Sequence, residues 1–232
     1  MISKENFQFL QELSENNNRD WFTENKKRYE QQHENTIDFA GEVLTLMQKH
    51  DNIENLNGKK SLMRIYRDVR FSKDKSPYKT HWGGYYKRAT ANLRGSYYFH
   101  LEPGKCFVGG GFWRPESADL KLVRAGMVAD EKELRAILSN KTFVQFFGKS
   151  ANDTGLHGES LKNVPKGFDK ESSAGDLLKL KQYLVLREFT DAEVLSPNFA
   201  QQVNETFKAI RPFFDWMSYT LTHDANGEEL VK

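Results

Sequence analysis

The sequence has one cysteine, six prolines and a net charge of only +2 over 232 residues. The single cysteine, Cys106, cannot form an internal disulfide or supply a cysteine-rich zinc site. No apolar run approaches the roughly 20 residues of a membrane-spanning helix, and the first residues lack the apolar core of a signal peptide. We therefore expect a cytoplasmic protein with no membrane partner.

The residues that are present are typical of a packed globular protein. Hydrophobic residues make up 38% of the chain, with 17 Phe, nine Tyr and four Trp, which is enough to build a core. The length favours a single domain, and there is no internal repeat or low-complexity linker. We predict one α+β domain over 1–232. It has a helical N-terminal region at 1–58, a basic strand-rich core at 59–115, and helices, an irregular segment, a strand and a C-terminal helix over 116–232.

Helical periodicity marks both ends of the chain. Ser3 is the expected N-cap of a first helix that ends near 16–18, and a second helical stretch runs to about residue 50. That stretch is one long helix, or two with a break near Glu34. A C-terminal helix begins after Ser196, and we expect Pro212 to kink or interrupt it.

Alternating and aromatic residues between these ends predict strands. The expected strands lie at 62–66, 84–88, 96–101, 106–109 and 183–189. The connection at 102–105 is short enough for a hairpin, which makes its two flanking strands antiparallel neighbours. The predicted fold is α+β, with a central, mainly antiparallel sheet packed by N- and C-terminal helices.

Positive charge is concentrated in one segment. Residues 59–88 carry ten Lys or Arg and two Asp, a net charge of +8, so the rest of the chain sums to −6. Such a local field favours an anionic ligand or partner, and Arg and Lys suit carboxylate or phosphate. The predicted ligand-binding residues are Arg64, Arg67, Arg70, Lys73, Lys75, Tyr78, Lys79, Gly110, Gly111 and Trp113.

The acidic residues and the glycines of these segments leave alternatives open. Asp68 and Asp74 orient the cations, hold a metal ion, or join Arg67 in an ion-pair network that braces the loop. The glycines at 109–111 let a ligand approach the backbone closely, or simply form a tight strand end.

Established catalytic motifs are absent. The sequence has no Walker loop, no Gly-x-Ser-x-Gly elbow and no His-Glu-x-x-His, and we predict no cofactor and no dedicated metal site. His81 and Asp68 are the candidate proton-transfer groups, with a structural role as the alternative for each. His100 falls in an aromatic strand, where a structural role is expected.

Three functions are consistent with these features. The first is an anion-binding domain that captures a small phosphorylated or polycarboxylate ligand in a basic, aromatic-lined cleft. The second is an enzyme acting on a phosphorylated substrate. The third is sequence-tolerant binding of nucleic acid or of an acidic protein, which the aromatics interleaved with the cations favour. The near-neutral chain and the absence of nucleic-acid-binding motifs oppose the third. Ligand identity and oligomeric state are left open.

Several blocks resemble the signature of a domain-of-unknown-function family of bacterial and fungal proteins. The longest is Arg-Asp-Val-Arg-Phe-Ser-Lys-Asp-Lys-Ser-Pro-Tyr-Lys at 67–79. The others are Gly-Gly-Gly-Phe-Trp-Arg-Pro at 109–115, Pro-Lys-Gly-Phe-Asp at 165–169 followed by 176–181, and an opening block at 16–25. The family often has a His-Pro pair where this chain has Ser172 and Ser173, so no histidine chemistry is expected there. The resemblance covers nearly the whole chain and implies no known reaction.

Overall fold

The computed structural model describes residues 1–148, 154–224 and 226–230. The chain divides into two compact units. Unit 1 contains Met1–Lys87, Tyr98–Val108 and Glu188–Glu205, and unit 2 contains Arg88–Tyr97, Gly109–Arg187 and Thr206–Lys232. The single domain expected from the sequence stays a prediction.

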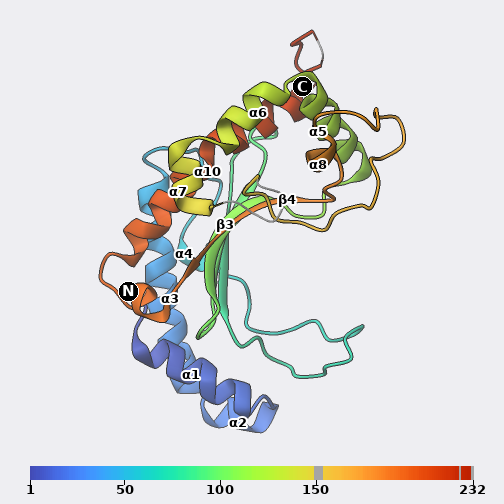
Figure 1. Ribbon diagram of the computed structural model, residues 1–232. Coiled ribbons are helices and arrows are strands. Elements are labelled where there is room, and N and C mark those ends of the chain that lie inside the picture. Colours follow the sequence, from blue (N-terminus) through green and yellow to red (C-terminus); the bar gives the residue numbers. More distant parts are fainter. Residues whose placement is uncertain (149–153, 225, 231–232) are drawn as a thin grey trace. The chain divides into compact units, whose positions relative to one another are not determined.

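A four-stranded antiparallel sheet has the strand order β1-β2-β3-β4 (Figure 1). The strands are β1 (Trp82–Lys87), β2 (Ser96–Leu101), β3 (Cys106–Phe112) and β4 (Tyr183–Phe189). This sheet, with helices at both ends of the chain, confirms the α+β class. Along β2, buried residues alternate with half-buried ones, because successive side chains of a strand point to opposite faces.

Four of the helices of unit 1 come from the N-terminal part of the chain. They are α1 (Lys4–Glu15), α2 (Arg19–Glu24), α3 (Lys26–Met47) and α4 (Gly58–Ser61). Ser3 caps α1 as predicted, in a capping box with Asn6. The second helical stretch breaks at Asn25, not near Glu34, because the Asn25 side chain donates to the main-chain oxygen of Trp21 and ends α2. In unit 1, α3 contacts α1, α2, α4 and β1. The short α9 (Asp191–Val194) also belongs to this unit.

Unit 2 contains α5 (Ser117–Ala129), α6 (Glu131–Leu138), α7 (Lys141–Phe147) and α8 (Gly175–Leu178). The last helix, α10 (Phe199–Thr222), is not interrupted at Pro212. Pro212 and Lys208 are both exposed, so the Lys208 carbonyl, which loses its helical partner to proline, can bond to water. Part of the irregular segment expected at 148–175, residues 149–153, lies outside the described residues. No helix in the described ranges is both long and apolar enough to cross a membrane.

Between α4 and β1 the chain forms a long loop, drawn in teal in Figure 1. The strand predicted at 62–66 is reduced to two isolated antiparallel bridges, Leu62 with Gly84 and Tyr66 with Tyr78. A regular ladder fails here for two reasons. Pro77 has no N–H, and the Asn17 side chain takes both main-chain groups of Tyr78, at 3.0 and 3.1 Å. We call residues 67–77 the basic loop.

Candidate functional site

One end of the basic loop borders a cavity of about 330 Å³ in unit 1, which we call the basic cavity. Its lining comes from three places: the end of α1, the base of the loop, and the segment that leads into β1. The lining residues are Ser14, Asn17, Arg67, Asp74, Ser76, Tyr78, Lys79, Thr80 and His81. The structure thus brings together five of the residues predicted from sequence to be ligand-binding, orienting or catalytic: Arg67, Asp74, Tyr78, Lys79 and His81.

Arg67 is held in this cavity by one of its nitrogens. Its Nη1 donates to Asp74 Oδ2 at 2.5 Å and to the main-chain oxygen of Ser76 at 3.1 Å. Among the described residues, neither Nε nor Nη2 of Arg67 has a protein partner. Nε and Nη2 form the side-on edge of the guanidinium, which matches the two oxygens of a carboxylate or phosphate. Arg67 is therefore oriented by the protein while its bidentate edge is left open.

Asp74 is fixed more tightly than its exposure suggests. The Ser76 hydroxyl and main-chain N–H both donate to its Oδ1, at 2.6 and 2.9 Å. These bonds, followed by the one from Arg67, lower the pKa of Asp74 to about 2. The carboxylate is therefore ionised throughout the neutral range, and it keeps Arg67 in place.

In Arg70, unlike Arg67, the side-on edge of the guanidinium is occupied by a carboxylate of the same loop. Nε and Nη2 of Arg70 both donate to Asp68, at 2.9 and 2.6 Å, and the pair is exposed to solvent. The bond from Arg70 lowers the pKa of Asp68. Arg70 and Asp68 are not among the residues that line the basic cavity, and the open edge seen on Arg67 is closed here.

The other cations of residues 64–79 also fall into two groups, one in the lining of the basic cavity and the rest exposed outside it. Lys79 lines the cavity, and its Nζ donates to the main-chain oxygen of Arg64 at 2.7 Å. That is its one protein partner among the described residues, so two of the three ammonium N–H groups are open. Burial and the charge of Arg64 lower the pKa of Lys79. Lys75 donates to the main-chain oxygen of Val69, and Arg64, Lys73 and Lys75 are exposed outside the lining.

Two aromatic residues, Tyr78 directly after the basic loop and Phe71 near its tip, differ in their exposure to solvent. Tyr78 is buried and stacks on Phe22 with ring centroids 3.9 Å apart, and burial raises its pKa. Phe71, near the tip, is 96% exposed, with the Arg70 guanidinium 5.9 Å from its ring centroid. Tyr78 therefore forms a rigid wall of the basic cavity, and Phe71 is open to a partner from solvent.

His81 is the residue directly before β1, four residues after the end of the basic loop. Its ring stacks on that of His100, with centroids 4.0 Å apart. Among the described residues no hydrogen-bond partner reaches either nitrogen of His81. Burial, followed by the nearby His100 and Lys79, lowers the pKa of His81 to about 4. The imidazole is therefore neutral at neutral pH and has a free nitrogen lone pair.

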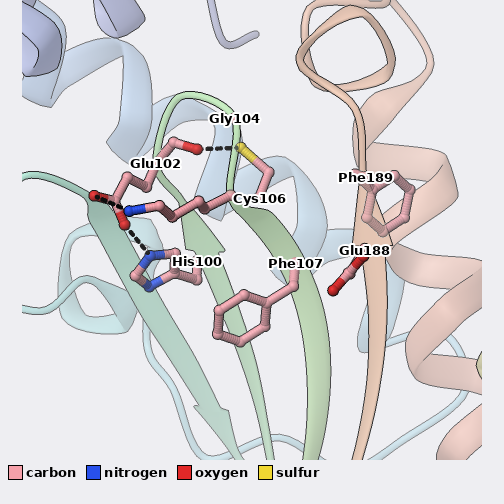
Figure 2. A pocket seen from close by; sticks show the side chains of 8 residues that line it. His100, Glu102, Gly104, Cys106, Phe107, Glu188 and Phe189 are labelled. Atoms are coloured by element: carbon pink, nitrogen blue, oxygen red, sulfur yellow. Dashed lines mark hydrogen bonds and ion pairs between the residues drawn. The ribbon is translucent and has the colours of Figure 1, made fainter.

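His100 belongs to a chain of polar side chains that the sequence reasoning missed. The Tyr98 hydroxyl lies 3.2 Å from Nδ1 of His100. On the other side of the ring, Nε2 of His100 lies 3.2 Å from Glu102, an interaction drawn as a dashed line in Figure 2. Thr80 donates to the other carboxylate oxygen of Glu102, also at 3.2 Å. The signal was present in the sequence, because positions 98 and 100 share one face of a strand and Glu102 follows directly after the strand at the same two-residue spacing. Their aromatic neighbours instead suggested an ordinary core strand.

Burial lowers the pKa of His100, against the raising effect of Glu102. For Glu102, burial acts to raise the pKa, but the hydrogen bonds from His100 and Thr80 outweigh it and leave the pKa lowered. Burial raises the pKa of Tyr98 to about 12. At neutral pH the chain is therefore a phenol, a neutral imidazole and a carboxylate, which fixes the His100 ring against which His81 stacks.

His100 also borders a second cavity, of about 360 Å³ (Figure 2). His100, Glu102, Phe107 and Glu188 are among its lining residues. Cys106 is also part of this lining, but burial raises the pKa of its thiol to about 12. A thiol of that pKa is a poor nucleophile at neutral pH.

The remaining predicted residues lie in unit 2. Gly110 and Gly111 are inside β3, and Trp113 follows it with 67% exposure. A Cβ atom on Gly111 would lie 2.1 Å from the main-chain oxygen of Tyr183, and one on Gly110 would lie 2.7 Å from that of Ser96. The space beside these glycines is filled by neighbouring strand backbone. Their role in ligand binding stays a prediction.

The described part of the chain contains no group of three or more His, Cys, Asp or Glu side chains that could hold a metal ion.

Comparison with known proteins finds that residues 5–216 match a family described as a conserved hypothetical protein, DUF2461. No curated protein and no solved structure matches the chain.

Proposed function

The chain belongs to the DUF2461 family of conserved hypothetical proteins, and we propose that it binds a small phosphorylated or polycarboxylate anion in the basic cavity. The observation that carries this proposal is the open side-on edge of Arg67. Nη1 of Arg67 is taken by Asp74 and Ser76, and this leaves Nε and Nη2 to form two parallel bonds to one anionic group.

Lys79 supplies the second charge at the same cavity. Its ammonium group is half-buried, where the charged form is less well solvated, and this lowers its pKa. A bound anion would relieve that cost by pairing with the two open N–H groups. Counting Arg67, Lys79 and Asp74, with His81 neutral, the charged groups of the lining sum to +1. The cavity therefore favours an anion, although Asp74 offsets part of the charge.

The size of the cavity restricts the ligand. A volume of about 330 Å³ lies at the lower end of the range for small-molecule sites. It suits one phosphate or carboxylate group with a short organic substituent. A nucleic-acid strand would have to use the exposed part of the loop, with Phe71 as a stacking surface and Arg70, Lys73 and Lys75 as phosphate contacts.

A binding experiment with two matched arginine variants tests the proposal. Inorganic phosphate, glycerol phosphate, citrate and a short single-stranded oligonucleotide are titrated into the full chain by calorimetry, with thermal shift as a second readout. Arg67→Ala is expected to weaken binding of the small anions at least tenfold. Arg70→Ala, which removes an arginine three residues away whose edge is already occupied, is expected to change it less than threefold.

A third variant separates ligand binding from bracing. Asp74→Asn removes the partner of Arg67 but keeps the guanidinium, and it removes a negative charge from the lining. If Arg67 binds the anion, this variant binds at least as tightly as the wild type. Equal loss in Arg67→Ala and Asp74→Asn would mean that the pair only braces the loop. A response to the oligonucleotide alone, lost as salt rises, would favour nucleic-acid binding.

A further inference from the structure

We propose that the basic cavity is a hydrolytic site in which His81 is the general base for cleavage of a phosphate ester held by Arg67 and Lys79. This inference rests on the proposed anion binding and adds a reaction to it. It starts from the position of His81, which lines the same cavity as the two cations. A group placed there lies beside whatever oxygen atoms the cations hold.

The His81 ring is both accessible and fixed. Its two nitrogens have no hydrogen-bond partner among the described residues, so at least one can contact water or a ligand in the cavity. Its orientation comes from stacking on His100 at 4.0 Å. His100 in turn is held at both nitrogens, by Tyr98 and by Glu102. His100 has no nitrogen left for a substrate, and we assign it a positioning role.

The protonation state of His81 suits a base. The charged or titratable groups around it are Lys79 on its own segment, His100 from β2, Glu102 directly after β2, and Arg67 and Asp74 in the cavity lining. Burial, His100 and Lys79 all lower its pKa, against the opposing effect of Glu102, and the result is about 4. The ring is neutral at pH 7, so its free lone pair can accept a proton, and a pKa of about 4 makes it a weak base at that pH.

The reaction requires water as the second reactant. His81 takes one proton from a water molecule as the water oxygen bonds to phosphorus. The bond from phosphorus to the ester oxygen then breaks, and its electron pair remains on that oxygen. The ester oxygen takes a proton from a second water molecule, and the protonated His81 returns its proton to the hydroxide that this leaves. An alcohol and inorganic phosphate are released, and His81 is neutral again. Arg67 and Lys79 stabilise the negative charge that develops on the phosphoryl oxygens.

Two other candidates are less suited to this role. Asp68 is bound at both carboxylate oxygens by Arg70 and does not line the cavity. Cys106 is buried, and its thiol has a raised pKa. In the described part of the cavity lining, His81 is therefore the one neutral base that is free to act.

The test measures hydrolysis of para-nitrophenyl phosphate and bis(para-nitrophenyl) phosphate by the full chain. His81→Asn is expected to lower kcat at least 100-fold, the range of general acid–base catalysis. Binding of inorganic phosphate should change less than threefold. His33→Asn is the matched control, because His33 is also half-buried and stacked on an aromatic ring, that of Tyr29, but lies outside the cavity lining. Its kcat should equal that of the wild type.

The pH profile gives a readout that a structural role would not produce. For the wild type, kcat/KM is expected to fall below about pH 4 as His81 becomes protonated. The residual activity of His81→Asn should lack this acid limb. Wild-type protein that binds phosphate but hydrolyses neither ester overturns the catalytic proposal and leaves anion binding intact. Equal rates in the wild type and His81→Asn also overturn it. Failure to bind any of phosphate, glycerol phosphate and citrate overturns both proposals.

Discussion

The basic loop and the glycine segment at 109–111 differ in the kind of signal that made each a candidate for ligand binding. In the loop, charged side chains project into solvent, and Arg67 and Asp74 line a cavity while Arg70 does not. In the glycine segment, the missing side chains allow strand backbone to pack closely. An excess of charge therefore marks a surface that something can approach, whereas a run of glycine can mark a place already occupied by the protein itself.

This comparison gives opposite expectations for stability and for binding. Substitution of Arg67 in the loop should change ligand binding and leave the fold nearly unchanged. Substitutions in the glycine segment should strongly destabilise the fold, because there is no room for a side chain. The following predictions test this difference.

The largest effect is expected for Gly111→Ala. Gly111 has φ of +143°, and an added Cβ would lie 2.1 Å from the Tyr183 oxygen. Both the left-handed backbone and the clash oppose alanine, and β3 and β4 would have to separate locally. We expect a loss of about 4 kcal/mol in the free energy of unfolding, measured by urea titration.

Gly104→Ala is the control for backbone strain alone. Gly104 has φ of +75°, but nothing lies within 4 Å of an added Cβ. Gly104→Ala should lower the free energy of unfolding by about 1 kcal/mol. Equal losses in Gly104→Ala and Gly111→Ala would show that close packing of β3 is not the reason for its glycines.

An intermediate effect is expected from pH. The pKa of His81 is lowered from 6.5 in its ordinary state to about 4 in the folded protein. The folded state therefore disfavours protonation, and the stability linked to His81 is present above pH 6.5 and lost as pH falls towards 4. The loss is at most about 3 kcal/mol. Urea titrations across this range should show a smaller decrease for His81→Asn than for the wild type. An identical decrease would contradict the shift assigned to His81.

The smallest effect is expected for the stability of the arginine variants. The pair of Arg70 with Asp68 is exposed, and exposed ion pairs contribute little to stability. Arg70→Ala should leave the urea midpoint unchanged, and Arg67→Ala should lower it less than Gly104→Ala does. Unfolding of Arg67→Ala under native conditions would show that the basic loop braces the fold, which would remove the contrast with the glycine segment.

Local patterns predicted the regular elements well. The strand at 96–101 matches β2, and that at 183–189 matches β4, because alternating buried residues and turn residues define them within a few positions. The break between helices was misplaced, because Asn25 ends α2 through a side-chain bond that no periodicity reveals. The strand expected at 62–66 was reduced to bridges, because Asn17 from a distant part of the chain occupies Tyr78.

The sequence by itself determined that positive charge gathers in one segment and that the fold is α+β, because charge and hydrophobic periodicity are local properties. It did not determine which arginine is open to a ligand. Arg67 and Arg70 are three residues apart, and only the folded loop places Asp74 on one nitrogen of the first and Asp68 across the whole edge of the second. The stacking of His81 on His100 was likewise decided by tertiary structure, because contacts between residues far apart in sequence follow from how the chain packs.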